Sequence, residues 1–157
     1  IVRWADCVYP KYYMWRYSVR VPGVAKAIRE LSQLGYVLIL SSNVGNAVRE
    51  LISREGIENL VEPPSPRYEY QTKRARLTVA QRTRKIPSSN TVYVGDTLAD
   101  VRFGRGLGVR TIGVLRCSRG FKEVARLADY TVQDITEVPA ILRSWHAGAG
   151  PKDSCRD

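Results

Sequence analysis

The sequence predicts an α/β fold, a Rossmann-like three-layer sandwich with a central parallel sheet of about five strands. Three observations predict it. Strand-like and helix-like stretches alternate along the chain, as expected when crossover helices cover both faces of a parallel sheet. The strand-like run "YVLIL" at 36–40 is apolar without alternation, which indicates a strand that is buried on both faces. Several helix-like stretches stop at a glycine, a common end for a helix.

The N-terminal part begins with a predicted strand at 1–5, "IVRWA". The Tyr- and Trp-rich stretch 8–20 has no clear period, and we predict a loop or flap there. A helix is expected over 21–35, because Pro22 suits a first turn, apolar residues recur on one face and a glycine stands at the end. The residues that carry this pattern are Val24, Ile28, Leu31 and Gly35.

The remaining elements follow from the same signals. After the strand at 36–40, the sequence predicts a helix over 44–56 that is closed by Gly56, a proline-rich connection over 62–70 and a strongly basic helix over 71–85. The C-terminal part is predicted to contain strands at 91–95, 110–115 and 129–133, and helices at 99–108, ended by Gly106 or Gly108, at 122–128 and at 134–145. We expect one domain over 1–146, with a minimal cap at about 8–20 and a flexible tail at 147–157.

Charge and composition narrow the class of protein. The net charge is +10 and 44% of the residues are hydrophobic, but no apolar run reaches the roughly 18–20 residues of a membrane helix. A basic surface can bind nucleic acid or a phosphorylated partner. The basic residues are spread along the chain, so we favour a solvated surface and regard nucleic acid as possible but not favoured.

The cysteines and the single histidine indicate neither a metal site nor a catalytic base. Cys7, Cys117 and Cys155 show no metal-ligand spacing and cannot all pair with one another, which fits a reducing compartment. No signal-peptide pattern starts the sequence, so a cytoplasmic location is expected. His146 lies near the tail in "SWHAGAG" and is predicted to be a surface residue.

Polar side chains follow three predicted strands at the point where each strand ends. They are Asp6, then Ser41, Ser42 and Asn43, and then Asp96. Ligands of parallel sheets bind at the carboxyl ends of the strands. Two carboxylates at one sheet edge call for a cation, and hard oxygen ligands suit Mg²⁺. A hydroxyl beside backbone amides at a helix start suits a phosphate.

Nearby charges complete this predicted pocket. Lys73 or Arg74, at the start of the basic helix, could hold the same phosphate. Asp100 lies one helical turn after Asp96 and either supports the metal or pairs with that basic residue. Taken singly, Ser42 and Asn43 could be a helix N-cap, and the two acids could respond to the helix dipole. Their shared position at three strand ends favours a pocket for metal and phosphate.

The order of these features resembles the haloacid dehalogenase superfamily of aspartate-nucleophile phosphohydrolases. "VPGVAKAIRELSQLGYVLILSSN" resembles the stretch that leads to the second motif, here Ser42 and Asn43. "VYVGDTLADV" matches the fourth motif, a Gly-Asp followed by an Asp four residues later. "GLGVRTIGVLRCSRGFKEVARLADYTVQDITEVPAIL" resembles the closing strands and helix, so that the resemblance covers about residues 1 to 143. The third-motif lysine falls on Lys73, although the spacing also allows Arg74.

The first motif departs from the family pattern, Asp-x-Asp-Gly-Thr, because "WADCVYP" contains one Asp. In one register Trp4 replaces the nucleophile and Asp6 takes the acid/base position, with Cys7, Val8 and Tyr9 over the family's Gly-Thr-Leu. In the other register Asp6 is the nucleophile and Val8, in the acid/base position, offers only its backbone carbonyl to the metal. We favour the second register, because it leaves a five-residue strand before the nucleophile.

The resemblance implies a Mg²⁺-dependent phosphohydrolase that acts through an aspartyl-phosphate. Asp6, Ser42 and Lys73 would be catalytic, and Asn43 and Arg74 would help to bind the phosphorylated substrate. Asp6, the Val8 carbonyl, Asp96 and Asp100 would hold the metal. The short cap implies a large substrate or a second subunit that covers the site. The alternative is a catalytically degenerate protein that binds a phosphorylated ligand, nucleic acid or a partner protein.

Overall fold

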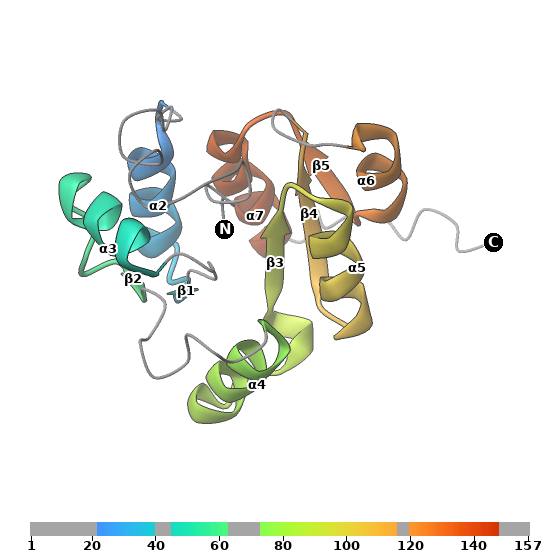
Figure 1. Cartoon of the computed structure of the whole chain (residues 1–157), viewed down its shortest axis with the longest axis horizontal. Coiled ribbons are helices and arrows are strands. Elements are labelled where there is room, and N and C mark those ends of the chain that lie inside the picture. The colour runs from blue at the N-terminus through green and yellow to red at the C-terminus, as the bar shows by residue number, and fades with distance from the viewer. Residues whose placement is uncertain (1–21, 40–44, 63–72, 116–119, 148–157) are drawn as a thin grey trace. The chain divides into compact units, whose positions relative to one another are not determined.

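The computed structural model describes residues 22–39, 45–62, 73–115 and 120–147 (Figure 1). The chain divides into two compact units, Ile1–Pro87 and Ser88–Asp157. All strand pairs in the described residues are parallel, which confirms the α/β class. The single domain over 1–146, the cap at about 8–20 and the tail at 147–157 stay predictions, and the strand predicted at 1–5 lies outside the described residues.

The N-terminal unit contains three described helices and a two-stranded parallel sheet. Its elements are α2 (Val24–Gln33), β1 (Leu38–Ile39), α3 (Gly45–Arg54), β2 (Val61–Glu62) and α4 (Lys73–Arg84). Leu38 pairs with Val61, and the core is formed by buried Ile52, Ile57 and Val61, with Ala25, Ile28, Leu38 and Leu60 packed against them. The three predicted helices are confirmed with shorter bounds. β2 was not predicted, because a strand of two residues is too short to show a periodic pattern.

The start of α2 differs from the prediction. Pro22 was expected in the first helical turn, but the N-cap is Gly23, with φ 84°, and the helix begins at Val24. Pro22 therefore precedes the helix. The predicted end is confirmed, since Gly35 has φ 85° and its amide donates to the Ser32 carbonyl.

The C-terminal unit is a three-stranded parallel sheet with three helices. Its main elements are β3 (Val92–Gly95), α5 (Leu98–Gly106), β4 (Arg110–Val114), α6 (Phe121–Leu127), β5 (Tyr130–Val132) and α7 (Val138–His146), with 3-10 turns η2 (Ser88–Asn90) and η3 (Ile135–Glu137). The strand order is β3-β4-β5. All three strands and all three helices were predicted. In the described part of the chain no helix combines the length and the apolar character needed to cross a membrane.

The helices of this unit cover both faces of the sheet, as Figure 1 shows for α5 and α6 on one face and α7 on the other. Gly113 faces α6, because a Cβ atom on it would lie 2.6 Å from Val124 Cγ1. Side chains alternate between the faces of a strand, so Arg110 and Tyr130 face the other way. Trp145 of α7 meets them there, with its ring 5.1 Å from the Arg110 guanidinium carbon and 6.0 Å from the Tyr130 ring.

Two helix ends resolve or correct the predictions. α5 has Gly106 as its last residue, and Gly108 then takes φ 66°. The amides of Gly108 and Val109 donate to the carbonyls of Arg105 and Gly104, which is a Schellman end. The helix predicted over 134–145 is divided into η3 and α7. Pro139 stands in the first turn of α7, the position that tolerates its missing N–H, and Asp134 and Glu137 form a separate capping box for η3.

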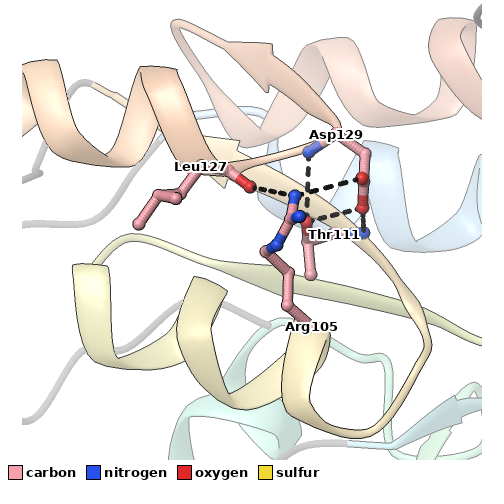
Figure 2. Close-up of polar contacts among 4 residues, drawn as sticks. All are labelled: Arg105, Thr111, Leu127 and Asp129. Carbon is pink, nitrogen blue, oxygen red and sulfur yellow. Dashed lines mark hydrogen bonds and ion pairs between the residues drawn. The ribbon is translucent and has the colours of Figure 1, made fainter. Parts of the chain in front are cut away.

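A polar network ties α5, β4 and the end of α6 together (Figure 2). Asp129 Oδ2 accepts hydrogen bonds of 2.8 Å from both the amide and the hydroxyl of Thr111, and the Asp129 amide donates to the Thr111 hydroxyl over 3.1 Å. Arg105 donates to the Leu127 carbonyl and pairs with Asp129. Thr111 is the second residue of β4, so the network lies at the amino end of that strand and stabilises the fold.

Candidate functional site

The candidate site begins where β3 ends. β3 stops at Gly95, Asp96 follows it, and Thr97 is the N-cap of α5. The Thr97 hydroxyl accepts a hydrogen bond of 3.2 Å from the Asp100 amide, as an N-cap side chain does for a free amide of the first turn. This cap sets the direction in which α5 leaves the strand, and it places Asp96 before the helix and Asp100 in its first turn.

Asp100 is held by side chains on both sides of the strand–helix junction. The Thr97 hydroxyl donates to Asp100 Oδ2 over 2.6 Å, and the Tyr93 hydroxyl donates to Oδ1 over 3.4 Å. Asp100 is 2% exposed and Tyr93 is 5% exposed. Tyr93 is also fixed by an edge-on contact with Phe103, whose ring centroid lies 5.1 Å away. The carboxylate is therefore anchored within a packed environment.

Gly95 makes this arrangement possible. A Cβ atom on Gly95 would lie 2.3 Å from Asp100 Cβ and 3.0 Å from its Cγ, closer than side-chain carbons approach one another. A residue without a side chain is required here because the first turn of α5 packs directly against the end of β3. The glycine of the Gly-Asp pair is therefore required for steric reasons. Its lack of a side chain lets Asp100 lie at the strand end that carries Asp96.

Asp96 and Asp100 are both buried, and Asp96 is 9% exposed. Burying carboxylates costs free energy unless polar or cationic groups compensate them. Two acids at the carboxyl end of a parallel strand supply hard oxygen donors, the ligands that Mg²⁺ prefers. The chemistry of this donor pair therefore fits a divalent cation. In the described ranges no group of three or more Asp, Glu, His or Cys residues is positioned to hold a metal.

The other predicted site residues belong to the N-terminal unit, and most of them lie outside the described residues. Lys73 and Arg74 are the first two residues of α4 in the N-terminal unit, and Arg74 is exposed. Asp96 and Asp100 belong to the C-terminal unit, and the structure brings these two together. The predicted roles of Asp6, Val8, Ser42 and Asn43 concern positions outside the described residues. The alternatives of Lys73 or Arg74 for the phosphate, and of a metal or basic partner for Asp100, stay predictions.

Sequence reasoning missed the two residues that hold Asp100. Thr97 and Asp100 form a Thr-x-x-Asp pattern before a helix, a variant of the capping signal that could have revealed Thr97. Tyr93 precedes Gly95 by two residues, so the two lie on the same face of the strand. That periodicity would have indicated that Tyr93 faces α5. It would not have shown that its hydroxyl reaches Asp100.

Comparisons with known proteins agree with this geometry. A family model described as haloacid dehalogenase-like hydrolase matches residues 14–114, a range that includes β3, Asp96 and Asp100. D-glycero-beta-D-manno-heptose-1,7-bisphosphate 7-phosphatase of Haemophilus influenzae is 25% identical over 152 residues, which cover 78% of this chain and 83% of that protein.

Solved structures show the same fold at lower identity. A haloacid dehalogenase-like hydrolase from Streptococcus pneumoniae has a TM-score of 0.63 at 18% identity, over 78% of this chain and 59% of that one. L-2-haloacid dehalogenase from Xanthobacter autotrophicus, with chloropropionic acid covalently bound, has a TM-score of 0.62 at 12% identity, over 86% of this chain and 68% of that one. The chain thus spans 59% of the length of the streptococcal protein. Because the family model covers most of the sequence, the chain belongs to the haloacid dehalogenase-like hydrolases.

Proposed function

We propose that this chain is a Mg²⁺-dependent phosphohydrolase that forms an aspartyl-phosphate on Asp6. The observation that carries the proposal is the buried pair of carboxylates after β3, Asp96 and Asp100, with Asp100 held by Thr97 and Tyr93. Such an anchored acidic pair suits a cation that must meet a phosphate. The similarity to a phosphatase that acts on a heptose bisphosphate supports the same reaction class.

The residues that would hold Mg²⁺ are Asp96, Asp100, Asp6 and the backbone carbonyl of Val8. When bound, the cation would neutralise charge on the phosphoryl oxygens and on the attacking carboxylate. The hydroxyl groups of Thr97 and Tyr93 would hold the Asp100 carboxylate in one orientation toward the metal. Thr97 and Tyr93 act as positioning residues through Asp100.

The chemical steps use the chain's own groups. A carboxylate oxygen of Asp6 attacks phosphorus, so that an oxygen–phosphorus bond forms and the bond to the leaving group breaks. Ser42, Asn43 and Lys73 or Arg74 hold the phosphoryl oxygens during this transfer. Water then attacks the phosphorus of the aspartyl-phosphate, which releases inorganic phosphate and restores the Asp6 carboxylate. Positioning and charge neutralisation supply most of the acceleration in such transfers.

The position occupied by Val8 has a consequence for the leaving group. A valine cannot protonate the departing oxygen, and general acid catalysis is typically worth about 10²–10⁴ in rate. Aryl phosphates, whose phenolate leaves without a proton, should therefore be hydrolysed far better than alkyl phosphates. Val8→Asp should restore activity toward alkyl phosphates and change aryl phosphate hydrolysis much less.

The test is hydrolysis of an aryl phosphate by the parent protein with Mg²⁺, with chelator, and after Asp6→Ala, Asp96→Asn or Asp100→Asn. We expect loss of turnover in every case except the parent with Mg²⁺. Asp134→Asn is the matched control, because Asp134 caps η3 and asparagine caps equally well. Turnover that survives chelation or Asp6→Ala would refute the proposal.

The single Asp of "WADCVYP" favours one second candidate function. If Trp4 occupies the nucleophile position, the protein would bind a phosphorylated ligand without turnover. A parent protein that is inert at every Mg²⁺ concentration, but is stabilised against unfolding by phosphate with Mg²⁺, would establish this alternative.

A further inference from the structure

The exposed side of α4 carries a concentration of positive charge, of which the phosphatase proposal uses Arg74 at most. Residues 73–85 contain six basic and no acidic residues. Arg74, Arg82 and Lys85 are exposed, and α4 is drawn in green in Figure 1. We call these three exposed residues together the basic face of α4.

Helix geometry places two of these cations, Arg74 and Arg82, on neighbouring parts of the helix surface. Arg74 and Arg82 are eight residues apart, which is about 12 Å along the axis and about 80° around it. Lys85 follows immediately after the helix end. Leu77, Gln81 and Arg84 are partly buried, and the Arg84 guanidinium pairs with Glu62. α4 therefore carries exposed cations beside a partly buried arginine that is paired within the unit.

Lys85 occupies a backbone position that favours glycine. It has φ 54° and is the non-glycine residue with positive φ in the described part of the chain. Its amide donates to the Arg82 carbonyl, and the Ile86 amide donates to the Gln81 carbonyl, which forms a Schellman end with Lys85 at the left-handed position.

The other described helix ends with this geometry use glycine. Gly35, Gly56 and Gly108, with φ of 85°, 61° and 66°, end α2, α3 and α5. A lysine in that conformation is disfavoured, because its Cβ crowds the backbone. Strained backbone positions cluster at functional sites, and the distinctive group that lysine adds at this one is its ammonium.

We propose that the basic face of α4 binds the phosphate backbone of nucleic acid without reading its sequence. A duplex presents one negative charge for roughly every 1.7 Å of its axis, so a phosphate is available to each of the three cations in any register. A guanidinium group can also donate two parallel hydrogen bonds to two oxygens of one phosphate. An amphipathic membrane contact is less suited, since Val79, 38% exposed, is the only large exposed apolar side chain among the described residues of α4.

This inference goes beyond hydrolysis and does not depend on it. Arg82 and Lys85 are not part of the candidate site, so they can be altered without touching the groups proposed to bind phosphate esters. Arg74 is left unchanged in the test, because it is one of the two candidates for holding the substrate phosphate.

The test measures binding of the whole chain to a fluorescent 20-base-pair DNA duplex and to the matching RNA duplex, by anisotropy between 50 and 200 mM KCl. Each cation that contacts a phosphate adds about 0.9 to the slope of log affinity against log salt on B-DNA. For the DNA duplex, Arg82→Gln with Lys85→Gly should reduce the steepness of this slope by about 1.8. Raising the salt from 50 to 200 mM should therefore weaken the binding of the variant by a factor about 12 times smaller than the factor for the parent.

Two controls make the result specific. Arg102→Gln with Lys122→Gln removes two exposed charges from α5 and α6 and should leave the slope close to that of the parent. Lys85→Gly alone should raise or preserve the melting temperature, so that weaker binding cannot result from unfolding. Aryl phosphate hydrolysis by the Arg82/Lys85 variant should equal that of the parent.

Three results would overturn the proposal. They are no binding of either duplex at 50 mM salt, an equal fall in slope in the Arg102/Lys122 control, and binding of poly-glutamate as tight and as salt-dependent as that of the duplexes. The last result would assign the basic face to an acidic polypeptide partner.

Discussion

Replacing Gly95 by alanine tests whether the close packing of α5 against β3 is what makes the acidic site. The new Cβ would lie 2.3 Å from Asp100 Cβ and 3.2 Å from its Oδ2. Carbon atoms in contact are about 3.5–4.0 Å apart, so Asp100 must move by more than about 1 Å. A misplacement of that size can cost about 10²-fold in rate. We expect Mg²⁺-dependent aryl phosphate hydrolysis to fall by roughly that factor.

The same substitution should also destabilise the fold, because overpacking of this kind typically costs about 1–3 kcal/mol. Activity must therefore be expressed per folded molecule, from urea unfolding measured on the same preparation. A Mg²⁺ titration of the rate should show that Gly95→Ala needs more metal for half-maximal turnover, because a displaced Asp100 holds the ion less well.

Gly113→Ala is the matched control. Its Cβ would meet Val124 Cγ1 at 2.6 Å, a similar overlap between β4 and α6 that does not involve Asp100. We expect a comparable loss of stability, with activity per folded molecule close to that of the parent. A folded Gly95→Ala protein whose activity and Mg²⁺ requirement stay within about twofold of the parent would refute the reasoning that Gly95 is needed to position Asp100.

Three further substitutions test individual contacts. Thr111→Val keeps the shape of the side chain but removes the hydroxyl bonded to Asp129. Urea unfolding should show a free energy of unfolding lower by about 1–2 kcal/mol. This is near the lower end for hydrogen bonds to charged groups, because Asp129 is partly exposed. A loss below about 0.5 kcal/mol, the size expected of surface changes such as Thr83→Val, would contradict this. Lys85→Gly should stabilise the protein by about 0.5–1 kcal/mol by relaxing a left-handed residue, and a decrease in melting temperature would show that Lys85 is not strained. Tyr93→Phe should retain the ring contact with Phe103 and lower the free energy of unfolding by less than about 1 kcal/mol. It should raise the Mg²⁺ concentration needed for half-maximal hydrolysis, because the hydroxyl that holds Asp100 is lost. An unchanged Mg²⁺ requirement would show that the hydroxyl has no role in holding Asp100.

The acidic site shows how far local pattern reaches. A run of apolar residues that stops at a glycine was sufficient to predict where β3 ends, and the two acids that follow it four residues apart stay the predicted metal ligands. Burial of Asp96 and Asp100 is consistent with that prediction. The pattern could not reveal that the Tyr93 hydroxyl reaches Asp100, because that contact depends on how α5 lies against the sheet.

The sequence by itself determined the class of the fold, the number and order of the strands and helices in the C-terminal unit, and most helix ends. These properties follow from chemistry that acts within a few residues, such as apolar periodicity and the left-handed φ that favours Gly35 and Gly56. The tertiary structure alone decided the bonds between Thr111 and Asp129, which are eighteen residues apart, and the contact that forbids a side chain on Gly95. Contacts of this kind arise only when packing brings separate elements together, and no local preference of either residue specifies its partner.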